Sequence, residues 1–349
     1  MALPAFYSSN FFVEHLAIRE KSGITDMSGI KKVWVSGPDA QTFINRNITR
    51  DCDVIRHGFS AYTTLLNDEG SVVDDAIVFR MRADDLSDVK AEWLLCLGAG
   101  QGLNLLIESA KNHDAYVSVD DFLHCVLIQG ATAFDEVTSA LEIPELNEMK
   151  RFQHKWVEFS NCKFMVSRTT FSGEDGFEIF GDEDGIKKIW SLFTTIPGKR
   201  ILPVGFNALN IARIEAGLLF YGQDMTGVET PNELGLDFVV DLKKECFRGK
   251  KSLINRLDSP RITLVGVETN GHHKFYEEIT LYFKKSPVGK VKCLVFSTWL
   301  NKTIGFAHIN PAFAHFGSVL EAFATHNPKK SVQFKISSRY FYNRLKNSL

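Results

Sequence analysis

The sequence predicts an α+β fold with an all-β barrel domain at its C-terminal end. Up to residue 258, patterns typical of short amphipathic helices are mixed with strand-like runs, without the regular alternation that a parallel sheet requires. From Arg261 onward only short β runs separated by turns remain, which is typical of a small barrel or sandwich. A turn-forming segment at 258–260 therefore divides the chain into residues 1–258 and a C-terminal domain at 259–349.

The first part of the chain opens with a helical pattern. Residues 12–20 place Val13, Leu16 and Ala17 on one face, and the helix is expected to stop near Gly23. The elements expected next, in order, are a strand at 32–35, a helix at 40–47 opened by Pro38 and Asp39, strands at 63–66, 72–79 and 94–97, and a helix at 103–111.

A polar turn at 67–70 separates two of these strands and predicts a β-hairpin. Asn and Asp bond to their own backbone there, and glycine allows a positive φ. The second strand carries the adjacent carboxylates Asp74 and Asp75. Neighbouring side chains of a strand point to opposite faces, so the two cannot share one environment. The residues alone leave open whether they form a solvated strand edge or include a buried carboxylate that needs a partner.

Glycines 98, 100 and 102 lie between a predicted strand and a predicted helix, with two acids further along the chain. This arrangement resembles the first motif of S-adenosylmethionine methyltransferases, in which glycines let the backbone approach the cofactor. Two departures argue against it. Cys96 stands where that motif usually carries an acid, and Leu103 stands where the dinucleotide pattern requires glycine. Methyltransferase activity remains an alternative at this point.

A second glycine turn, within residues 171–180, leads into an alternating run that predicts a strand containing Glu178. From local sequence Glu178 is an edge-strand surface residue, and Glu174, in the turn, is expected to be solvated. The other expected elements are strands at 155–159, 163–169 and 236–240, helices at 186–193, 208–215 and 250–256, and barrel strands at 263–268, 279–283, 288–296, 303–308 and 332–336.

The composition excludes several function classes. With 44% hydrophobic residues, 23% charged residues, a formal net charge of −2 and a pI near 6.6, neither nucleic acid nor an anionic membrane is expected as a partner. No apolar run approaches the roughly 18 residues of a spanning helix, and no signal-peptide pattern opens the chain, so a cytoplasmic protein is expected. The 6 cysteines form no CxxC pair and the 10 histidines form no HExxH motif, so no metal site is predicted.

Three longer segments carry a family resemblance. They are YTTLLNDEGSVVDDAIVFR at 62–80, SGEDGFEIF at 172–180 and PVGFNALNIARIEAGLLFYGQDM at 203–225. With the shorter segments 25–40 and 230–253, they resemble in order and spacing the T-protein (aminomethyltransferase) family of the glycine cleavage system. The resemblance implies a three-lobed fold around a central tetrahydrofolate pocket, in which two intertwined α+β lobes precede the barrel.

The resemblance also implies an activity, the transfer of a one-carbon unit from a donor to tetrahydrofolate. In an aminomethyltransferase the donor is the aminomethyl group on a lipoyl carrier protein. The alternatives are a tetrahydrofolate-dependent demethylase of a small sulfonium, amine or ether donor, and a folate-binding protein without transfer activity. The expected partner is therefore a small-molecule donor or a lipoyl carrier protein.

Site residues follow from the same resemblance, position by position. Asp75 falls on the catalytic aspartate, where a carboxylate can stabilise the charge that develops on folate nitrogens, and Asp74 would be structural. Glu178 falls on the pterin-binding glutamate, whose two oxygens match a ring N–H and an amino N–H side by side. The other residues expected at the folate pocket are Tyr62, Phe171, Phe79 and Arg213.

Some positions depart from the family pattern. Leu209 replaces an arginine four residues before Arg213, Phe171 and Phe79 stand where tyrosines are usual, and Gly98 replaces an asparagine. Each lost polar partner of a buried site typically costs about 1 to 3 kcal/mol unless the ligand itself differs. The departures therefore favour a changed one-carbon donor with a retained pterin site.

Overall fold

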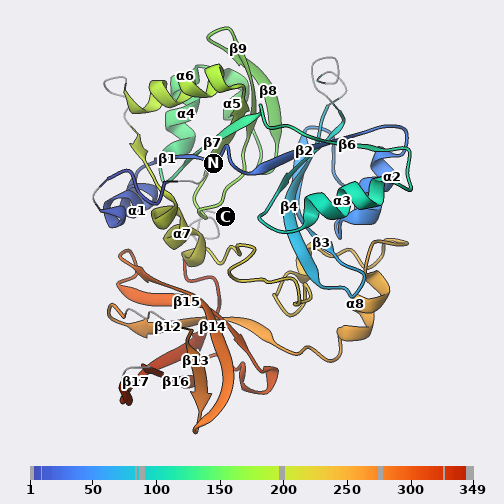
Figure 1. The fold of residues 1–349 in the computed structure, drawn as a ribbon. Helices are drawn as coiled ribbons and strands as arrows, with labels where there is room; N and C mark the ends of the chain where they lie inside the picture. Colours follow the sequence, from blue (N-terminus) through green and yellow to red (C-terminus); the bar gives the residue numbers. More distant parts are fainter. Residues whose placement is uncertain are drawn as a thin grey trace.

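In this computed structural model the chain forms three lobes, each built on one sheet (Figure 1). The structure describes residues 4–8, 10–82, 85, 91–195, 201–273, 278–324 and 327–342. Among these residues no helix combines the length and the apolar character that crossing a membrane would need. The predicted fold class, α+β with a C-terminal β-barrel, is confirmed.

The first lobe holds a six-stranded sheet in the order β11-β1-β7-β10-β9-β8. Its outer face packs on helices α4 and α6, because Phe177 and Ile179 point to that side and share a buried cluster with Val137 and Ile189. The elements of this lobe are β1 (Gly23–Asp26), β7 (His124–Gln129), α4 (Ala133–Leu141), α5 (Pro144–Asn147), β8 (His154–Phe159), β9 (Cys162–Ser167), β10 (Gly176–Gly181), α6 (Glu183–Thr194) and β11 (Leu202–Pro203).

The second lobe interrupts the first, since its strands lie between β1 and β7 in the sequence. Its five-stranded sheet has the order β3-β4-β5-β2-β6, and helices α2 and α3 cover its outer face. Its elements are β2 (Lys31–Ser36), α2 (Ala40–Asn47), β3 (Phe59–Leu66), β4 (Val72–Arg80), β5 (Trp93–Leu97), α3 (Gly102–Ala110) and β6 (Tyr116–Val119). The predicted hairpin at 62–80 is β3 and β4, which pair antiparallel.

The third lobe is a closed barrel in the order β12-β15-β14-β13-β16-β17. The domain boundary predicted at 258/259 lies between helix α8 and strand β12. Its strands are β12 (Thr263–Asn270), β13 (Thr280–Phe283), β14 (Ser286–Ser297), β15 (Lys302–Ile309), β16 (Val319–Ala324) and β17 (Asn327–Ser337), with a 3₁₀ turn, η3, at Pro311–Phe313. The connecting elements are α7 (Phe206–Glu215), η2 (Asp237–Val239) and α8 (Lys250–Arg256).

The inner faces of the first two sheets meet in one apolar cluster. Phe79 and Leu94 of the second sheet share it with Leu127, Met165 and Phe180 of the first. Because side chains alternate along a strand, the residues at 75, 77 and 79 of β4 face this junction, and so do 178 and 180 of β10. The two sheets therefore present their functional side chains to the same space.

Helix α1 (Phe11–Glu20) differs from its predicted packing. Val13 is 53% exposed, whereas Glu14, His15 and Arg19 are fully buried. Glu14 accepts a hydrogen bond from the backbone N–H of Gly205, and Arg19 forms ion pairs with glutamates of two other segments. The predicted apolar face was wrong because α1 is held by buried polar contacts as much as by apolar ones.

Two further predictions need correction. Residues 236–240 were expected to form a strand, but residues 237–239 form the 3₁₀ turn η2. Leu236, just before the turn, and Val239, at its end, are both buried. Glu174 was expected to be solvated, but its side chain is fully buried and lies 2.8 Å from the guanidinium of Arg19. The elements that were not predicted from the sequence include strands β6, β7, β11 and β16 and helices α4 and α5.

Candidate active site

Asp75 lies on β4 beside Tyr62 of the neighbouring strand β3. The Tyr62 hydroxyl donates a hydrogen bond of 2.9 Å to Asp75 Oδ2, and the Gly98 N–H donates one of 2.8 Å to the Asp75 carbonyl. Both side chains are partly buried and face the junction of the two sheets. The hairpin therefore fixes the orientation of this carboxylate while leaving part of it accessible.

The electrostatic surroundings of Asp75 favour proton exchange near neutral pH. Burial, and then the charge of Asp74, raise the pKa of Asp75 to about 7, against the opposing effect of the Tyr62 hydroxyl. Burial and the nearby Asp75 hold the pKa of Tyr62 well above its usual value, so the phenol stays protonated and acts as a donor. A carboxyl poised in this way can take up or release a proton during a reaction.

Asp74 points to the opposite face of β4, where it binds the glycine loop. It is 1% exposed, and its carboxylate accepts hydrogen bonds from the backbone N–H groups of Gly100 at 3.1 Å and Gly102 at 3.0 Å. Since α3 begins at Gly102, this carboxylate sits at a helix N-terminus, where a negative charge is favoured. The structural role predicted for Asp74 is confirmed.

The same contacts explain why residues 100 and 102 are glycines, whereas a Cβ atom at Gly98 would lie 2.3 Å from Asp75 Oδ1. A Cβ atom at Gly100 would lie 2.2 Å from the Val73 carbonyl oxygen, and one at Gly102 would lie 2.7 Å from Asp74 Oδ2. The loop therefore needs glycine to close on a carboxylate of its own chain. The resemblance to a methyltransferase cofactor loop therefore arises because these glycines let the backbone bind the Asp74 carboxylate.

We expect Asp74→Asn to lower the pKa of Asp75 and to destabilise the loop. The substitution removes the like charge that helps to raise the pKa of Asp75, and its amide NH₂ cannot accept from the loop N–H groups. The free energy of unfolding should fall by about 1 to 3 kcal/mol.

Carboxyl-carbon NMR titration of Asp75 measures the pKa, and urea unfolding measures the stability. Asp121→Asn is a matched control, because the Asp121 side chain is 74% exposed and pairs only with a surface lysine among the described residues. An unchanged titration of Asp75 in Asp74→Asn would contradict the electrostatic coupling.

Glu178 lies on β10, between β7 and β9, and faces the same junction. It is 8% exposed, and burial raises its pKa to about 7, opposed by a hydrogen bond from Thr169. A carboxylate with so little hydrogen bonding of its own is suited to a ligand that brings N–H donors. Local sequence suggested a surface position for Glu178; the structure buries it.

The neighbours of Glu178 are poor nucleophiles. Burial, followed by the charge of Glu178, raises the pKa of the Cys96 and Cys125 thiols. Thiols with raised pKa values stay protonated at neutral pH. The two thiols are therefore not expected to act as nucleophiles at this junction.

The aromatic residues at the predicted pocket occupy two different environments. Phe171 is partly exposed and packs at the margin of the junction cluster. Phe79 has no exposed surface and packs edge-to-face on His154 and Phe180. Leu209, in the position of the missing arginine, is 2% exposed in the same cluster. Apolar packing thus fills space where the family pattern has polar groups.

Arg213 is fully buried on α7. Its guanidinium pairs with Asp224 and also donates to the side chains of Gln223 and Asn210 and to the Leu218 carbonyl. Its side chain has no exposed surface, so a direct ligand contact would require the 218–224 segment to move. Arg213 and Phe79 therefore have no surface that a ligand could contact in this arrangement, whereas Asp75, Tyr62 and Phe171 are partly exposed and Glu178 is 8% exposed.

Sequence reasoning missed the charged groups that join the site to the barrel. Glu215 of α7 pairs with Arg19 at 2.6 Å and with His15 at 3.0 Å, and it accepts a hydrogen bond from Ser297 of β14. Three ionisable residues within the short α1 segment were the available signal. Their spacing at 14, 15 and 19 could not indicate which partners they meet.

Comparison with known proteins gives a consistent result. A family model described as the GCVT N-terminal domain matches residues 1–244. The heme-dependent oxidative N-demethylase gamma subunit of Ectopseudomonas mendocina (strain ymp) is 32% identical over 325 residues, covering 90% of this chain and 84% of that protein. The aminomethyltransferase of Thermotoga neapolitana is 30% identical over 343 residues, covering 97% and 91%.

A solved structure shows the same fold. The crystal structure of glycine cleavage system aminomethyltransferase T from Bartonella henselae superposes with a TM-score of 0.85 at 23% identity, covering 98% of this chain and 92% of that one. The resemblance inferred from the sequence segments is confirmed by the family model and by the relatives. The chain belongs to the glycine cleavage T-protein (aminomethyltransferase) family.

Proposed function

We propose that this protein is a folate-dependent one-carbon transferase of the aminomethyltransferase type, with tetrahydrofolate bound at the junction of the first two sheets. The observation that carries the proposal is the presence of two buried carboxyls, Asp75 on the second sheet and Glu178 on the first, whose strands face this junction and whose pKa values are raised to about 7. Membership of the family supports the class of reaction.

The side chains at the junction fit a pterin. Glu178 offers two carboxylate oxygens and has little hydrogen bonding from the protein, which suits a ring N–H and an amino group side by side. Phe171 supplies a partly exposed aromatic face for stacking. Tetrahydrofolate supplies the nitrogen nucleophile that accepts the one-carbon unit.

Asp75 is the proposed catalytic residue. Its carboxylate accepts the proton that leaves the reacting nitrogen, and it stabilises positive charge near that atom. Tyr62 orients the carboxylate through its 2.9 Å hydrogen bond. Phe79 and Arg213 complete the proposal as supporting residues, because neither side chain has exposed surface.

Two donor classes remain to be distinguished. The orthodox donor is an aminomethyl group on a lipoyl carrier protein. The second candidate is a small N-methyl compound, whose one-carbon unit would be captured by folate during demethylation. Leu209 and Phe171 favour this second candidate, because they replace polar groups of the family pattern with apolar ones, and the similarity to an N-demethylase subunit agrees with it.

Product analysis tests the function. The purified protein is incubated with tetrahydrofolate and either an aminomethylated lipoyl carrier or a set of small N-methyl, S-methyl and O-methyl donors. Formation of methylene-tetrahydrofolate and ammonia from the carrier supports the orthodox reaction, whereas methyl-tetrahydrofolate and the demethylated compound from a small donor support a demethylase. Binding without turnover on any donor would leave a folate-binding protein and refute transferase activity.

Glu178→Gln is expected to weaken tetrahydrofolate binding by about 10- to 100-fold. The amide replaces one acceptor oxygen by a donor NH₂, which would face the donors of the pterin. Calorimetric titration measures the affinity. Glu183→Gln is the matched control, because Glu183 is 66% exposed on α6. Unchanged affinity in Glu178→Gln would refute this placement of the pterin.

The same site predicts the pH dependence of binding. Because the pKa of Glu178 is raised to about 7 and the proposed ligand binds the carboxylate form, binding releases a proton, and affinity should decrease as the pH falls below about 7. Titrations in buffers of different ionisation enthalpy measure the proton release. Glu178→Gln should abolish this proton release while the contribution of Asp75 remains.

A further inference from the structure

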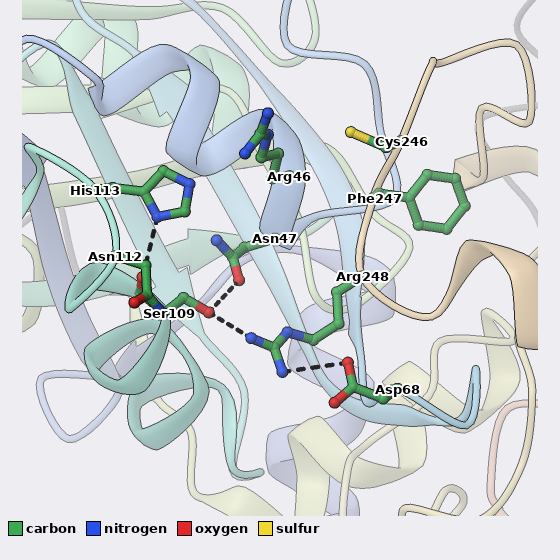
Figure 2. A pocket seen from close by; sticks show the side chains of 9 residues that line it. All are labelled: Arg46, Asn47, Asp68, Ser109, Asn112, His113, Cys246, Phe247 and Arg248. Carbon is green, nitrogen blue, oxygen red and sulfur yellow. Dashed lines mark hydrogen bonds and ion pairs between the residues drawn. The ribbon is translucent and has the colours of Figure 1, made fainter.

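A second concave site lies on the outer side of the second lobe. A pocket of about 300 Å³ opens where the C-terminal ends of α2 and α3 meet the segment at 246–248 (Figure 2). None of the residues proposed above for the pterin or for proton transfer lines it. The residues that line this pocket therefore need a separate explanation.

The pocket carries two arginines. Arg248 donates to Ser109 Oγ at 2.7 Å and lies 3.4 Å from Asp68, whose side chain is 79% exposed at the rim. Ser109 in turn donates to Asn47 at 2.7 Å, so the guanidinium is held in a fixed position. Arg46 is exposed, and within the described part of the chain no hydrogen bond or ion pair engages its guanidinium.

Helices α2 and α3 both end at this pocket. The negative ends of their dipoles would by themselves disfavour an anion. The carbonyls of α2 are already engaged. Lys244 Nζ donates to the Asn45 and Ile48 carbonyls at 2.5 and 2.7 Å, and the Arg248 N–H donates to the Arg46 carbonyl at 2.8 Å. Lys244 is 6% exposed, so this buried cation offsets the negative end of the α2 dipole from inside the protein.

The surrounding sequence adds positive charge. Residues 243–251 (KKECFRGKK) contain five basic residues and one acidic residue. With Arg46 on α2 and only Asp68 opposing them at the pocket, the local field favours a negative ligand.

We propose that this pocket binds a small polyvalent oxyanion, such as a phosphate group or a polycarboxylate. Guanidinium groups bind the paired oxygens of phosphate and carboxylate by parallel N–H donors, and the side chain of Asn112 adds an amide group at the same wall. The Asn47 amide instead holds the wall in place, because it donates to the Phe43 carbonyl and accepts from Ser109. The volume is at the lower end of the range for small-molecule sites, so it admits a compact group. This site is independent of the folate reaction.

Calorimetric titration of the full chain with inorganic phosphate and, separately, with citrate in a low-salt chloride buffer tests the proposal. Saturable binding of either anion is expected, and Arg46→Gln should weaken it about tenfold or more. A preference for phosphate identifies a phosphoryl ligand, and a preference for citrate identifies a polycarboxylate. Arg151→Gln, an exposed arginine on the first lobe, should leave the binding unchanged.

Cys246 provides a second readout that does not depend on heat signals. It lines the pocket and is the exposed cysteine of this chain, whereas Cys162 is partly exposed and the others are buried. Bound anion should slow alkylation of Cys246, measured by mass spectrometry, and Arg46→Gln should remove this protection. The proposal is overturned if neither anion binds, or if Arg46→Gln and Arg151→Gln weaken binding equally.

Discussion

Replacement of Asp75 by asparagine is expected to lower kcat by about 10²- to 10⁴-fold while changing the affinity for tetrahydrofolate far less. The substitution keeps the shape of the side chain and the hydrogen bond from Tyr62, but it removes the group that titrates at about 7. An amide can neither accept the proton nor offset developing positive charge. Steady-state kinetics with the active donor, together with calorimetric titration of folate, measures both quantities.

The pH profile separates this role from a merely structural one. With Asp75 as the proton acceptor, kcat of the natural protein should rise with pH through about 7 and then level off, and Asp75→Asn should abolish that rise. Tyr62→Phe should move the rise to higher pH, because the lost hydrogen bond is one of the interactions that lower the pKa of Asp75. Full activity of Asp75→Asn would refute the assignment of the catalytic residue.

Patterns that depend on neighbouring positions in the sequence were sufficient for most of the fold. The period-2 alternation around a polar turn predicted the β3–β4 hairpin, and Asp74 and Asp75 do lie on opposite faces of β4. The loss of helical patterns after residue 258 predicted the barrel. These features follow from local backbone preferences and from the burial of one face of a strand. Both properties can be read from the order of residues within a short segment.

Features that depend on distant partners were not predictable in the same way. A glycine loop before a helix binds an anion whether that anion belongs to a cofactor or to Asp74 of the preceding hairpin, and the sequence is the same in both cases. Glu174 and Glu178 are four residues apart in one turn and strand, yet one pairs with Arg19 and the other faces the junction. Only the tertiary contacts decide between such roles.

The buried cluster of Arg19 with Glu174 and Glu215 leads to the second large prediction. Arg19→Met is expected to lower the free energy of unfolding by about 3 to 5 kcal/mol, because it leaves two buried carboxylates without the guanidinium that they share. Burial alone would raise the pKa of Glu215; the hydrogen bond from His15 and the charge of Arg19 instead keep it below its ordinary value. Calorimetric and urea unfolding measure the loss.

Because this cluster lies between α1, α7 and the barrel, the loss of stability in Arg19→Met should mainly weaken the contact between the third lobe and the rest of the chain. Ser297 and Thr298 of the barrel segment contact Glu215 and His15, so the same few charges tie α1 and α7 to the third lobe. Loss of Arg19 should therefore separate the unfolding of the barrel from that of the other lobes into two transitions. Lys187→Met removes an ion pair that is 66% exposed on both sides, and should leave a single unchanged transition. If both variants unfold like the natural protein, the cluster does not hold the lobes together, and the apolar contacts of α7 with the barrel must do so instead.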